Sequence, residues 1–408
     1  MTRTEVAVTG LGMVTPAGVG AEATWQGVCE GVPTALPDPG LVGLPVDFSC
    51  RVPDFRPTAY LGRRALWRTD RCSQLAVAAA CEGVRDAGLD PETWDSARVA
   101  VVIGTCFGGQ RSCEDGHHNL LRDGHEAVSP ALVPKMISNM PAAEVSMALR
   151  ARGVSLSVST ACASGASAIA LGRDMLASGS CDVVIAGGAD AAVTPLITSG
   201  FHCMGTLSGR CDDPATASRP FDADRDGFVL GEAAAVLVLE RADDARRRGA
   251  VPRADLAGCG STNDAYHVTA PHPEHLGAEA ALHAALFDAD VTPREVDHVN
   301  AHGTSTRIND AAEAALLARV FPHAPSVTSA KGALGHCLGA GGAVEAALTV
   351  LTLQRQLVPP TANLEAIAPG IELDLVSKAA REQRVDLAVS NAFGFGGHNA
   401  VLAFRRCP

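Results

Sequence analysis

The alternation of strand-like and helical segments along the chain predicts an α/β protein assembled from two duplicated halves. Residues 6–12 (VAVTGLG) and 254–260 (ADLAGCG) are similar segments, and each reads as a strand that runs into a Gly-x-Gly turn at the start of one half. Among the 408 residues, 47% are hydrophobic but only 4% are aromatic, so small aliphatic side chains must build the core. Such side chains favour close packing of helices on a sheet. We therefore expect an N-terminal half over residues 1–250 and a C-terminal half over residues 251–408.

The elements of the first half follow from apolar spacing and from the residues that start and stop helices. The Pro- and Gly-rich segment 33–57 is expected to be irregular, and the polar segment 110–126 to be a solvated helix or loop. Clusters of apolar residues predict strands. Alanine-rich segments predict helices where they end at a glycine or have a proline near their start. We expect strands over residues 5–12 and 99–104, and helices over residues 21–30, 70–88 and 130–148.

A long polar loop over residues 209–232 precedes the boundary between the halves. Its acidic segment, residues 222–227, is similar to a calcium loop but lacks the glutamate at the twelfth position and the flanking helices, so we exclude an EF-hand. A strand over residues 233–240 and a charged helix end over residues 241–249 should follow. In the second half, the same patterns predict helices over residues 276–288, 309–320 and 339–356.

The central stretch, residues 154–190, is expected to form a strand, a sharp turn, a helix and a second strand. Cys162 lies on the turn among small residues that leave room for a substrate. At the N-terminus of a helix, the helix dipole favours the thiolate and lowers the pKa of a cysteine. The backbone N–H of Cys162 would also stabilise an oxyanion. The alternative is a buried structural cysteine, which would need no other reactive residues.

Three glycine-rich loops of the second half supply such residues. His302 lies in NAHGTST, Lys331 and His336 lie in KGALGH, and residues 390–399 read SNAFGFGGHN. Each loop places polar groups at the end of a predicted strand, where ligands bind in α/β sheets. A single histidine of this kind is more often a satisfied loop residue. Three such loops after a cysteine on a turn indicate nucleophilic thiol chemistry.

Composition and charge argue against several classes of protein. The net charge of −12 argues against general nucleic-acid binding. No apolar run approaches 18 residues, and residues 1–10 contain no signal-peptide core, so we expect a cytoplasmic protein without a membrane span. The 13 cysteines form no C-x-x-C pair, and His117, His118 and His125 match no metal-binding spacing. We expect reduced thiols in the cytosol.

The motifs around Cys162, His302 and His336, together with SRPFDADRDGFVLGEAA and STNDAYHVTAP, resemble those of the β-ketoacyl-acyl-carrier-protein synthases. These are the elongating ketosynthases of the thiolase superfamily. The resemblance runs from VAVTGLGMVTP to the last strand and implies a thiolase-like five-layered αβαβα fold and a dimer. It also implies an acyltransferase with no tightly bound cofactor. Thiolases proper, the nearest rivals, use a second cysteine in a late glycine loop that here reads FGFGGH.

By this resemblance, Cys162 attacks an acyl thioester carried on the phosphopantetheine of an acyl carrier protein, and the backbone N–H groups of Cys162 and Phe395 hold the oxyanion. His302 and His336 bind the thioester oxygen of a malonyl unit, whose decarboxylation gives the attacking enolate. Lys331 orients the His302 side of the site. The resemblance further implies supporting roles for Glu345, Thr304 and Thr306, and a structural monovalent cation near Asn300, Glu345, Ser390 and Asn391.

Departures from the family pattern bear on the substrate. Phe107 stands where family members line the acyl pocket, and its ring would shorten or divert that pocket. Residues 307–310 (RIND) and His398 make the chain more similar to polyketide ketosynthases. We therefore expect the ketosynthase subunit of a type II polyketide or specialised fatty-acyl pathway, as a homodimer or as a heterodimer with a chain-length-factor-like subunit. The alternatives are a housekeeping β-ketoacyl-acyl-carrier-protein synthase II of fatty-acid synthesis and, more remotely, a catalytically silent scaffold subunit.

The carrier protein that the resemblance implies is acidic, as is this chain overall. Docking would therefore need a local positive patch. The most basic stretch of the first half, residues 61–71, is the candidate, and the alternative is an ordinary solvated helix face. The expected docking residues are Arg63, Arg64, Arg68, Arg71 and Arg210.

Overall fold

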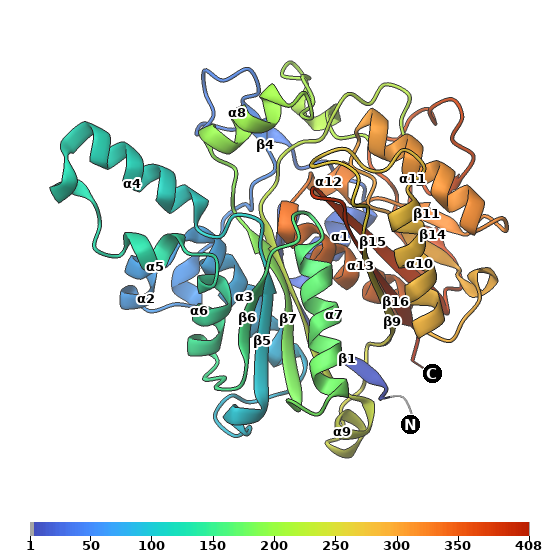
Figure 1. Cartoon of the computed structure of the whole chain (residues 1–408), viewed down its shortest axis with the longest axis horizontal. Helices are drawn as coiled ribbons and strands as arrows, with labels where there is room; N and C mark the ends of the chain where they lie inside the picture. The colour runs from blue at the N-terminus through green and yellow to red at the C-terminus, as the bar shows by residue number, and fades with distance from the viewer. Residues whose placement is uncertain (1–3, 408) are drawn as a thin grey trace.

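The computed structural model describes residues 4–407, which fold around one mixed sheet of 12 strands (Figure 1). These strands are β1 (Val6–Thr15), β2 (Gly18–Val19), β5 (Val99–Gly104), β6 (Ser155–Val158), β7 (Val183–Asp190), β8 (Ala233–Arg241), β9 (Ala254–Asn263), β10 (His298–Asn300), β11 (Ser326–Thr328), β13 (Asp374–Leu375), β15 (Leu387–Gly394) and β16 (His398–Arg405). Their order is β13-β11-β10-β15-β16-β9-β1-β8-β7-β5-β6, and β2 pairs with β1. Two short pairs lie apart from it, β3 (Leu36–Pro37) with β4 (Phe48–Ser49), and β12 (Leu357–Val358) with β14 (Arg381–Glu382).

The helices cover both faces of the sheet. They are α1 (Ala21–Cys29), α2 (Arg63–Arg68), α3 (Arg71–Asp86), α4 (Gln110–Asp123), α5 (Leu132–Met136), α6 (Met140–Ala148), α7 (Ser164–Ala177), α8 (Pro195–Cys203), α9 (Ala242–Arg247), α10 (Leu276–Asp288), α11 (Arg307–Val320), α12 (Lys331–Leu334) and α13 (Gly341–Arg355). Helix α4 projects from the body of the molecule (Figure 1). Within residues 4–407, none of these helices is long and apolar enough to cross a membrane.

The elements form five layers, which confirms the expected αβαβα arrangement. The N-terminal half of the sheet lies between α3 and the central helices α7 and α13, and the C-terminal half lies between those helices and α10 with α11. Strand β8 shows how the sequence separates the layers, because its side chains alternate between faces. Leu237 and Leu239 belong to the central hydrophobic cluster, whereas Val236 and Val238 belong to the outer cluster beneath α3.

The two halves repeat one packing device. In β1, a Cβ on Gly12 would lie 1.8 Å from the carbonyl oxygen of Ala79 in α3, and in β9 a Cβ on Gly260 would lie 1.9 Å from that of Ala281 in α10. The expected Gly-x-Gly turns are therefore wrong, since both glycine pairs lie inside strands and let a helix approach the backbone closely. Strands β1 and β9 are antiparallel neighbours and join the halves through two residue pairs. The expected boundary between the two halves, at residues 250 and 251, falls between α9 and β9. Residues 1–3 of the first half and residue 408 of the second lie outside the described residues.

Two other predicted elements differ from the structure. The helix expected over residues 130–148 is divided into α5 and α6, because Pro141 fits only the first turn of a helix and is the second residue of α6. The glycine loop expected over residues 390–399 is mostly strand, since β15 and β16 form a hairpin that pairs as far as Gly394 and His398. Only residues 395–397 form its turn, where Gly396 and Gly397 have positive φ angles of 81° and 74°.

Candidate active site

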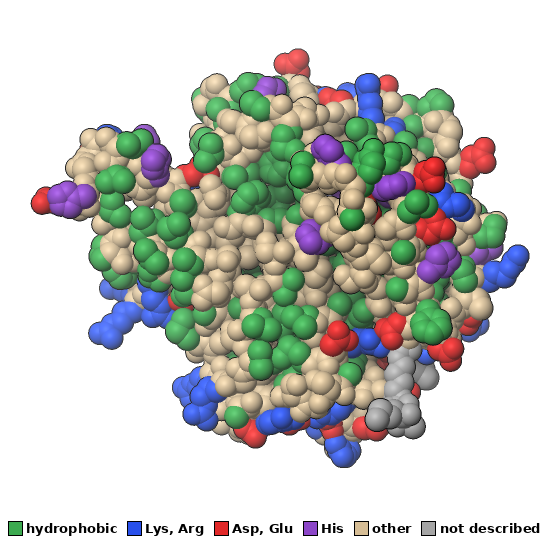
Figure 2. All heavy atoms as spheres, viewed as in Figure 1, with side chains coloured by type: hydrophobic (Ala, Val, Ile, Leu, Met, Phe, Trp, Pro, Cys, Tyr) green, Lys and Arg blue, Asp and Glu red, His purple; other side chains and the backbone are tan. Residues whose placement is uncertain are grey.

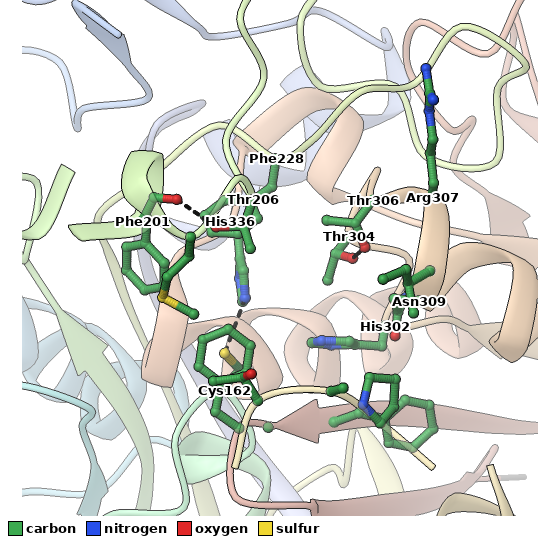
Figure 3. A pocket seen from close by; sticks show the side chains of 18 of the residues that line it. Cys162, Phe201, Thr206, Phe228, His302, Thr304, Thr306, Arg307, Asn309 and His336 are labelled. Carbon is green, nitrogen blue, oxygen red and sulfur yellow. Dashed lines mark hydrogen bonds between the residues drawn. The ribbon is translucent and has the colours of Figure 1, made fainter. Parts of the chain in front are cut away.

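A cavity of about 460 Å³ opens where the carboxyl ends of several strands and the loops of both halves meet. Cys162, His302 and His336 all border it, so the structure brings the three expected reactive residues together (Figure 3). Much of the remaining wall is aromatic or aliphatic, with Phe201, Phe228, Phe393, Phe395, Met204 and Leu338. Figure 2 shows a recess lined by hydrophobic side chains below α8. Such a cavity suits an acyl chain at its apolar wall and a thioester at its polar residues.

Cys162 lies on a sharp turn between β6 and α7. Ala161 has a φ of 50°, a value that few non-glycine residues adopt, and this turns the chain abruptly before the helix. Ser164 stabilises the turn, because its hydroxyl donates to the carbonyl of Ala161 at 2.6 Å and accepts from the N–H of Thr160 at 2.9 Å. Cys162 Sγ lies 3.2 Å from His336 Nε2. The turn therefore directs the thiol towards the histidine.

The surroundings of Cys162 favour its thiolate. A hydrogen bond with Cys106 is the largest cause that lowers the pKa of Cys162 well below its usual range, and the charges of His336 and Lys331 act in the same direction. Burial opposes this shift. Because the thiolate is the reactive form of cysteine, this environment suits a nucleophile.

His302 is held from behind by two buried charged groups. Lys331 Nζ donates to the backbone oxygen of His302 at 2.5 Å, lies 3.5 Å from His302 Nδ1, and forms an ion pair with Glu345. Burial first, and then the charge of Lys331, lower the pKa of His302 well below its usual range, so the imidazole is neutral. Burial raises the pKa of Glu345 to about 7, and Lys331 opposes that rise. Lys331 therefore contacts His302 directly, and Glu345 is the ion-pair partner of Lys331.

The two histidine rings meet at right angles over the thiol. Their centroids are 5.6 Å apart with an interplanar angle of 83°, and the ring of Phe228 packs against His336 at 5.2 Å. Thr304 and Thr306 border the same cavity and their hydroxyls lie 2.9 Å apart. Phe395 also borders the cavity, beside Gly394, where a Cβ would lie 3.1 Å from Cys162 N. The hairpin turn thus lies against the backbone of the nucleophile, as an oxyanion hole shared by Cys162 and Phe395 requires.

Two buried acids that sequence reasoning missed organise the site. Glu313 in α11 accepts from the backbone N–H groups of both His302 and Gly303 at 2.8 Å. Asp190 at the end of β7 accepts from Gly339 N at 2.7 Å and from Cys106 N at 2.9 Å. The position of Asp190 at a strand end was a signal that could have identified it, whereas Glu313 looks in the sequence like any helix acid.

The expected docking arginines fall into two groups. Arg63 and Arg64 are exposed on α2, and within the described residues neither forms an ion pair. Arg68 and Arg71 instead bind the buried carboxylates of Glu144 and Glu232. Arg210 donates to the backbone oxygen of Asp224 at 2.8 Å. Among the described residues, only Arg63 and Arg64 of these five have no ion-pair or side-chain hydrogen-bond partner.

Phe107 and the implied cation remain predictions. Phe107 is half-buried against the hydrophobic cluster that also contacts Phe201, but it does not border the cavity. Of the residues expected around a cation, Asn300 and Ser390 face each other on β10 and β15. Asn300 directs its amide to α13, whereas Asn391 donates to Glu313 on the other side of the sheet. The side-chain oxygens of Asn300 and Asn391 are both buried and have no hydrogen-bond partner among the described residues.

No group of three or more His, Cys, Asp and Glu side chains with metal-binding geometry occurs within residues 4–407.

A buried cysteine on a turn with two neutral or hydrogen-bonded histidines defines a thiol-dependent acyl-transfer site, and comparisons with known proteins agree. Residues 3–245 match the β-ketoacyl synthase N-terminal domain, and residues 253–365 match the β-ketoacyl synthase C-terminal domain. The chain therefore belongs to the β-ketoacyl synthase family and is an acyltransferase. This confirms the expected family.

Full-length relatives and solved structures resemble the whole chain. The chain is 41% identical to 3-oxoacyl-[acyl-carrier-protein] synthase 2 of Vibrio harveyi, over 100% of this chain and 99% of the relative. It is 41% identical to the protein of the same name from Synechocystis sp., over 98% of each. The ishigamide ketosynthase/chain length factor structure matches with a TM-score of 0.94 and 33% identity over 100% of both chains. A type II polyketide ketosynthase solved with its acyl-carrier protein (AntDE:AntF) matches with a TM-score of 0.92 and 28% identity, again over 100% of both.

Proposed function

We propose that this enzyme condenses an acyl group held on Cys162 with a malonyl unit on an acyl carrier protein, releasing carbon dioxide and a β-ketoacyl-carrier protein. The observation that carries the proposal is the contact of Cys162 Sγ with His336 Nε2 at 3.2 Å, with His302 perpendicular beside it at the base of an apolar cavity. We propose that it works as the ketosynthase subunit of a type II polyketide or specialised fatty-acyl pathway.

In the first half of the reaction, the Cys162 thiolate attacks the carbonyl carbon of an acyl thioester. The C–S bond to the carrier's phosphopantetheine breaks, its sulfur leaves as a thiolate, and the acyl group stays on Cys162. The backbone N–H groups of Cys162 and Phe395 are assigned to the oxyanion of the tetrahedral intermediate, since Gly394 packs against Cys162 N. The apolar wall around Phe201 and Met204 receives the acyl chain.

In the second half, malonyl-carrier protein enters and its carboxylate leaves as carbon dioxide. The electron pair of the broken C–C bond forms an enolate, whose oxygen accepts hydrogen bonds from His302 and His336. A neutral His302 suits this role, because it can donate to the developing charge without protonating the carbanion. The enolate carbon then attacks the acyl carbonyl, and the bond to Cys162 Sγ breaks and restores the thiolate.

An exposed edge of the sheet indicates where a partner subunit would pair. Strand β6 is one edge of the sheet, and Leu156 within it and Val154 just before it are each 42% exposed. An apolar edge strand favours pairing with another chain, so we propose a homodimer or a heterodimer with a chain-length-factor-like subunit, as the ishigamide and ApeO–ApeC structures are described. A second candidate function is that of an elongating enzyme of fatty-acid synthesis. The 41% identity to 3-oxoacyl-[acyl-carrier-protein] synthase 2 supports this function.

A cytoplasmic location is part of the proposal. All 13 cysteines are free thiols in the structure, and a reducing compartment is needed to keep Cys162 reactive.

Intact-protein mass after incubation with a panel of acyl-carrier proteins tests the reaction. Wild type should gain the mass of the acyl group, and malonyl-carrier protein should then remove it and yield ketoacyl product. Cys162→Ala should gain no mass, while the control Cys211→Ser, which removes an exposed thiol, should behave as wild type. Absence of acyl mass from every donor, with and without a chain-length-factor-like subunit, would favour the silent scaffold. Products of several extensions with that subunit would support the polyketide role, and single extensions by the chain alone would support the fatty-acid role.

A further inference from the structure

Two cysteines from adjacent strands meet beside the cavity. Strands β5 and β6 are parallel and pair from Val101 with Ser155 to Gly104 with Val158. The carboxyl ends of parallel strands lie at one edge of a sheet, so the turns that follow emerge side by side. Cys106 lies on the turn after β5, and Cys162 lies on the turn after β6.

Backbone contacts hold these two turns together. A Cβ on Gly104 would lie 2.2 Å from the carbonyl oxygen of Ser164, so the β5 backbone touches the start of α7. Thr105 N donates to the carbonyl of Val158 at 3.0 Å, and Cys106 N donates to Asp190 at 2.9 Å. The turns are therefore fixed relative to each other, and their side chains do not depend on a mobile loop.

The side chains of Cys106 and Cys162 lie close enough to interact directly, and each thiol is the largest single influence on the pKa of the other. This contact raises the pKa of Cys106 and lowers the pKa of Cys162, so a neutral thiol lies against a thiolate. Among the described cavity-lining residues, Cys162 is the only cysteine. A small molecule that enters the cavity therefore reaches the thiolate first, with the second thiol already in contact.

We propose that Cys106 is a resolving thiol, which closes a reversible Cys106–Cys162 disulfide after a hydroperoxide oxidises Cys162. The disulfide would stop acyl transfer while it lasts, and it would protect the nucleophile from irreversible oxidation. This property goes beyond the condensation reaction. It requires a reactive thiol at Cys162 but no particular acyl chain or carrier protein.

The chemistry balances with hydrogen peroxide as the oxidant. The Cys162 thiolate attacks one peroxide oxygen, the O–O bond breaks, and the products are Cys162 sulfenic acid and hydroxide. The Cys106 sulfur then attacks the Cys162 sulfur, an S–S bond forms, and the sulfenic oxygen leaves as water with the proton of Cys106. Two thiol sulfurs are thereby oxidised and one peroxide is reduced. A dithiol such as dithiothreitol reverses the bond by exchange.

Other buried thiols near the site are engaged elsewhere. Cys72 Sγ donates to the carbonyl oxygen of Ala189 at 3.2 Å, and Cys337 Sγ donates to that of Leu334 at 3.7 Å. The structure thus singles out Cys106 as the partner.

The experiment treats full-length wild type, Cys106→Ser and the control Cys211→Ser with hydrogen peroxide and reads intact mass and non-reducing peptide maps. Wild type and Cys211→Ser should lose the mass of two hydrogen atoms and yield a linked pair of Cys106 and Cys162 peptides. Cys106→Ser should instead gain two or three oxygen atoms on Cys162. Dithiothreitol should return wild type almost fully to its untreated mass and leave Cys106→Ser oxidised.

Several outcomes would overturn the proposal. These are oxygen gain on Cys162 of wild type without a linked peptide, a link from Cys162 to any other cysteine, or equal recovery of mass by Cys106→Ser. Because serine keeps a hydroxyl of similar size at this position, Cys106→Ser should fold, and circular dichroism checks this. Cys106→Ala, with the same expected masses, is the second variant. The masses do not depend on turnover, so they remain informative even if the condensation activity proposed above fails.

Discussion

Glu313 binds the backbone of the His302 loop through both of its carboxylate oxygens. Oε1 accepts from His302 N and Oε2 accepts from Gly303 N, each at 2.8 Å. Asn391 adds a third hydrogen bond to Oε1 at 3.2 Å. The carboxylate is fully buried, and burial raises its pKa. A catalytic loop that follows a strand of three residues is therefore positioned by one side chain from the next helix.

Glu313→Gln should weaken this positioning. The glutamine amide group would face one of the two backbone N–H donors, and that buried donor would lose its acceptor. We expect the free energy of unfolding to fall by about 2 kcal/mol and kcat/KM to fall roughly 10–100-fold through a displaced His302. Urea unfolding and steady-state kinetics check both. Glu365→Gln, an exposed acid, is the control and should match wild type. Wild-type kcat/KM in Glu313→Gln would show that the loop does not need this carboxylate.

Asp190 should make stability depend on pH. Burial raises the pKa of this carboxyl from an ordinary value of 3.8 to about 6, although hydrogen bonds from Cys106 N, Thr105 and other donors oppose the rise. Between these two values the folded protein holds a proton that the unfolded chain releases. The stability from this group is therefore complete below pH 3.8 and is lost as pH rises to about 6.

Asp190→Asn cannot titrate and isolates this contribution. The free energy of unfolding of wild type, minus that of the variant, should decrease by about 2 kcal/mol between pH 4 and pH 6. Urea unfolding at several pH values measures this difference. A wild-type-minus-Asp190→Asn difference that stays flat would mean that Asp190 is ionised throughout.

Gly12 and Gly260 should be equally intolerant of a side chain. An alanine Cβ would meet a helix carbonyl oxygen at 1.8 Å or 1.9 Å, so α3 or α10 must move away from its strand. Each variant, Gly12→Ala and Gly260→Ala, should lose about 3 kcal/mol or more of unfolding free energy. Gly200→Ala is the matched control, because a Cβ there meets nothing within 4 Å. Thermal and urea unfolding measure these losses. If only one of the two variants lost stability, the two halves would not share this close packing of a helix on a glycine of a strand.

The same glycines show where sequence reasoning reaches its limit. Cys162 and His302 could be predicted because each lies in a short motif of small residues whose local pattern indicates a reactive loop. Gly12 was expected in a turn, because the sequence does not reveal that a helix seventy residues later would press on the strand at that point. Glu313 was missed for the same reason, since its burial depends on how α11 packs against β15. Local patterns predicted residues that the structure brings to one cavity, and long-range packing decided which residues hold them there.

The two groups of arginines near α2 should respond differently to mutation. The double variant Arg63→Glu and Arg64→Glu reverses two exposed charges without breaking an ion pair among the described residues. If an acidic carrier protein docks there, KM for carrier-bound substrate should rise by roughly tenfold, with kcat and stability unchanged. A small pantetheine thioester needs no docking surface, and its kinetics should not change.

Arg68→Gln is the matched comparison from the same helix. It leaves the carboxylate of Glu144, which is 1% exposed, without its two guanidinium hydrogen bonds of 2.9 Å and 3.0 Å. We expect a loss of about 3 kcal/mol in unfolding free energy, because an unpaired buried charge is costly, and little change in KM of the folded protein. Kinetics with carrier-bound and small substrates, beside urea unfolding, separate the two roles. An unchanged KM in the double variant would remove α2 as the docking surface, while a raised KM in Arg68→Gln at unchanged stability would reassign Arg68 from structure to docking.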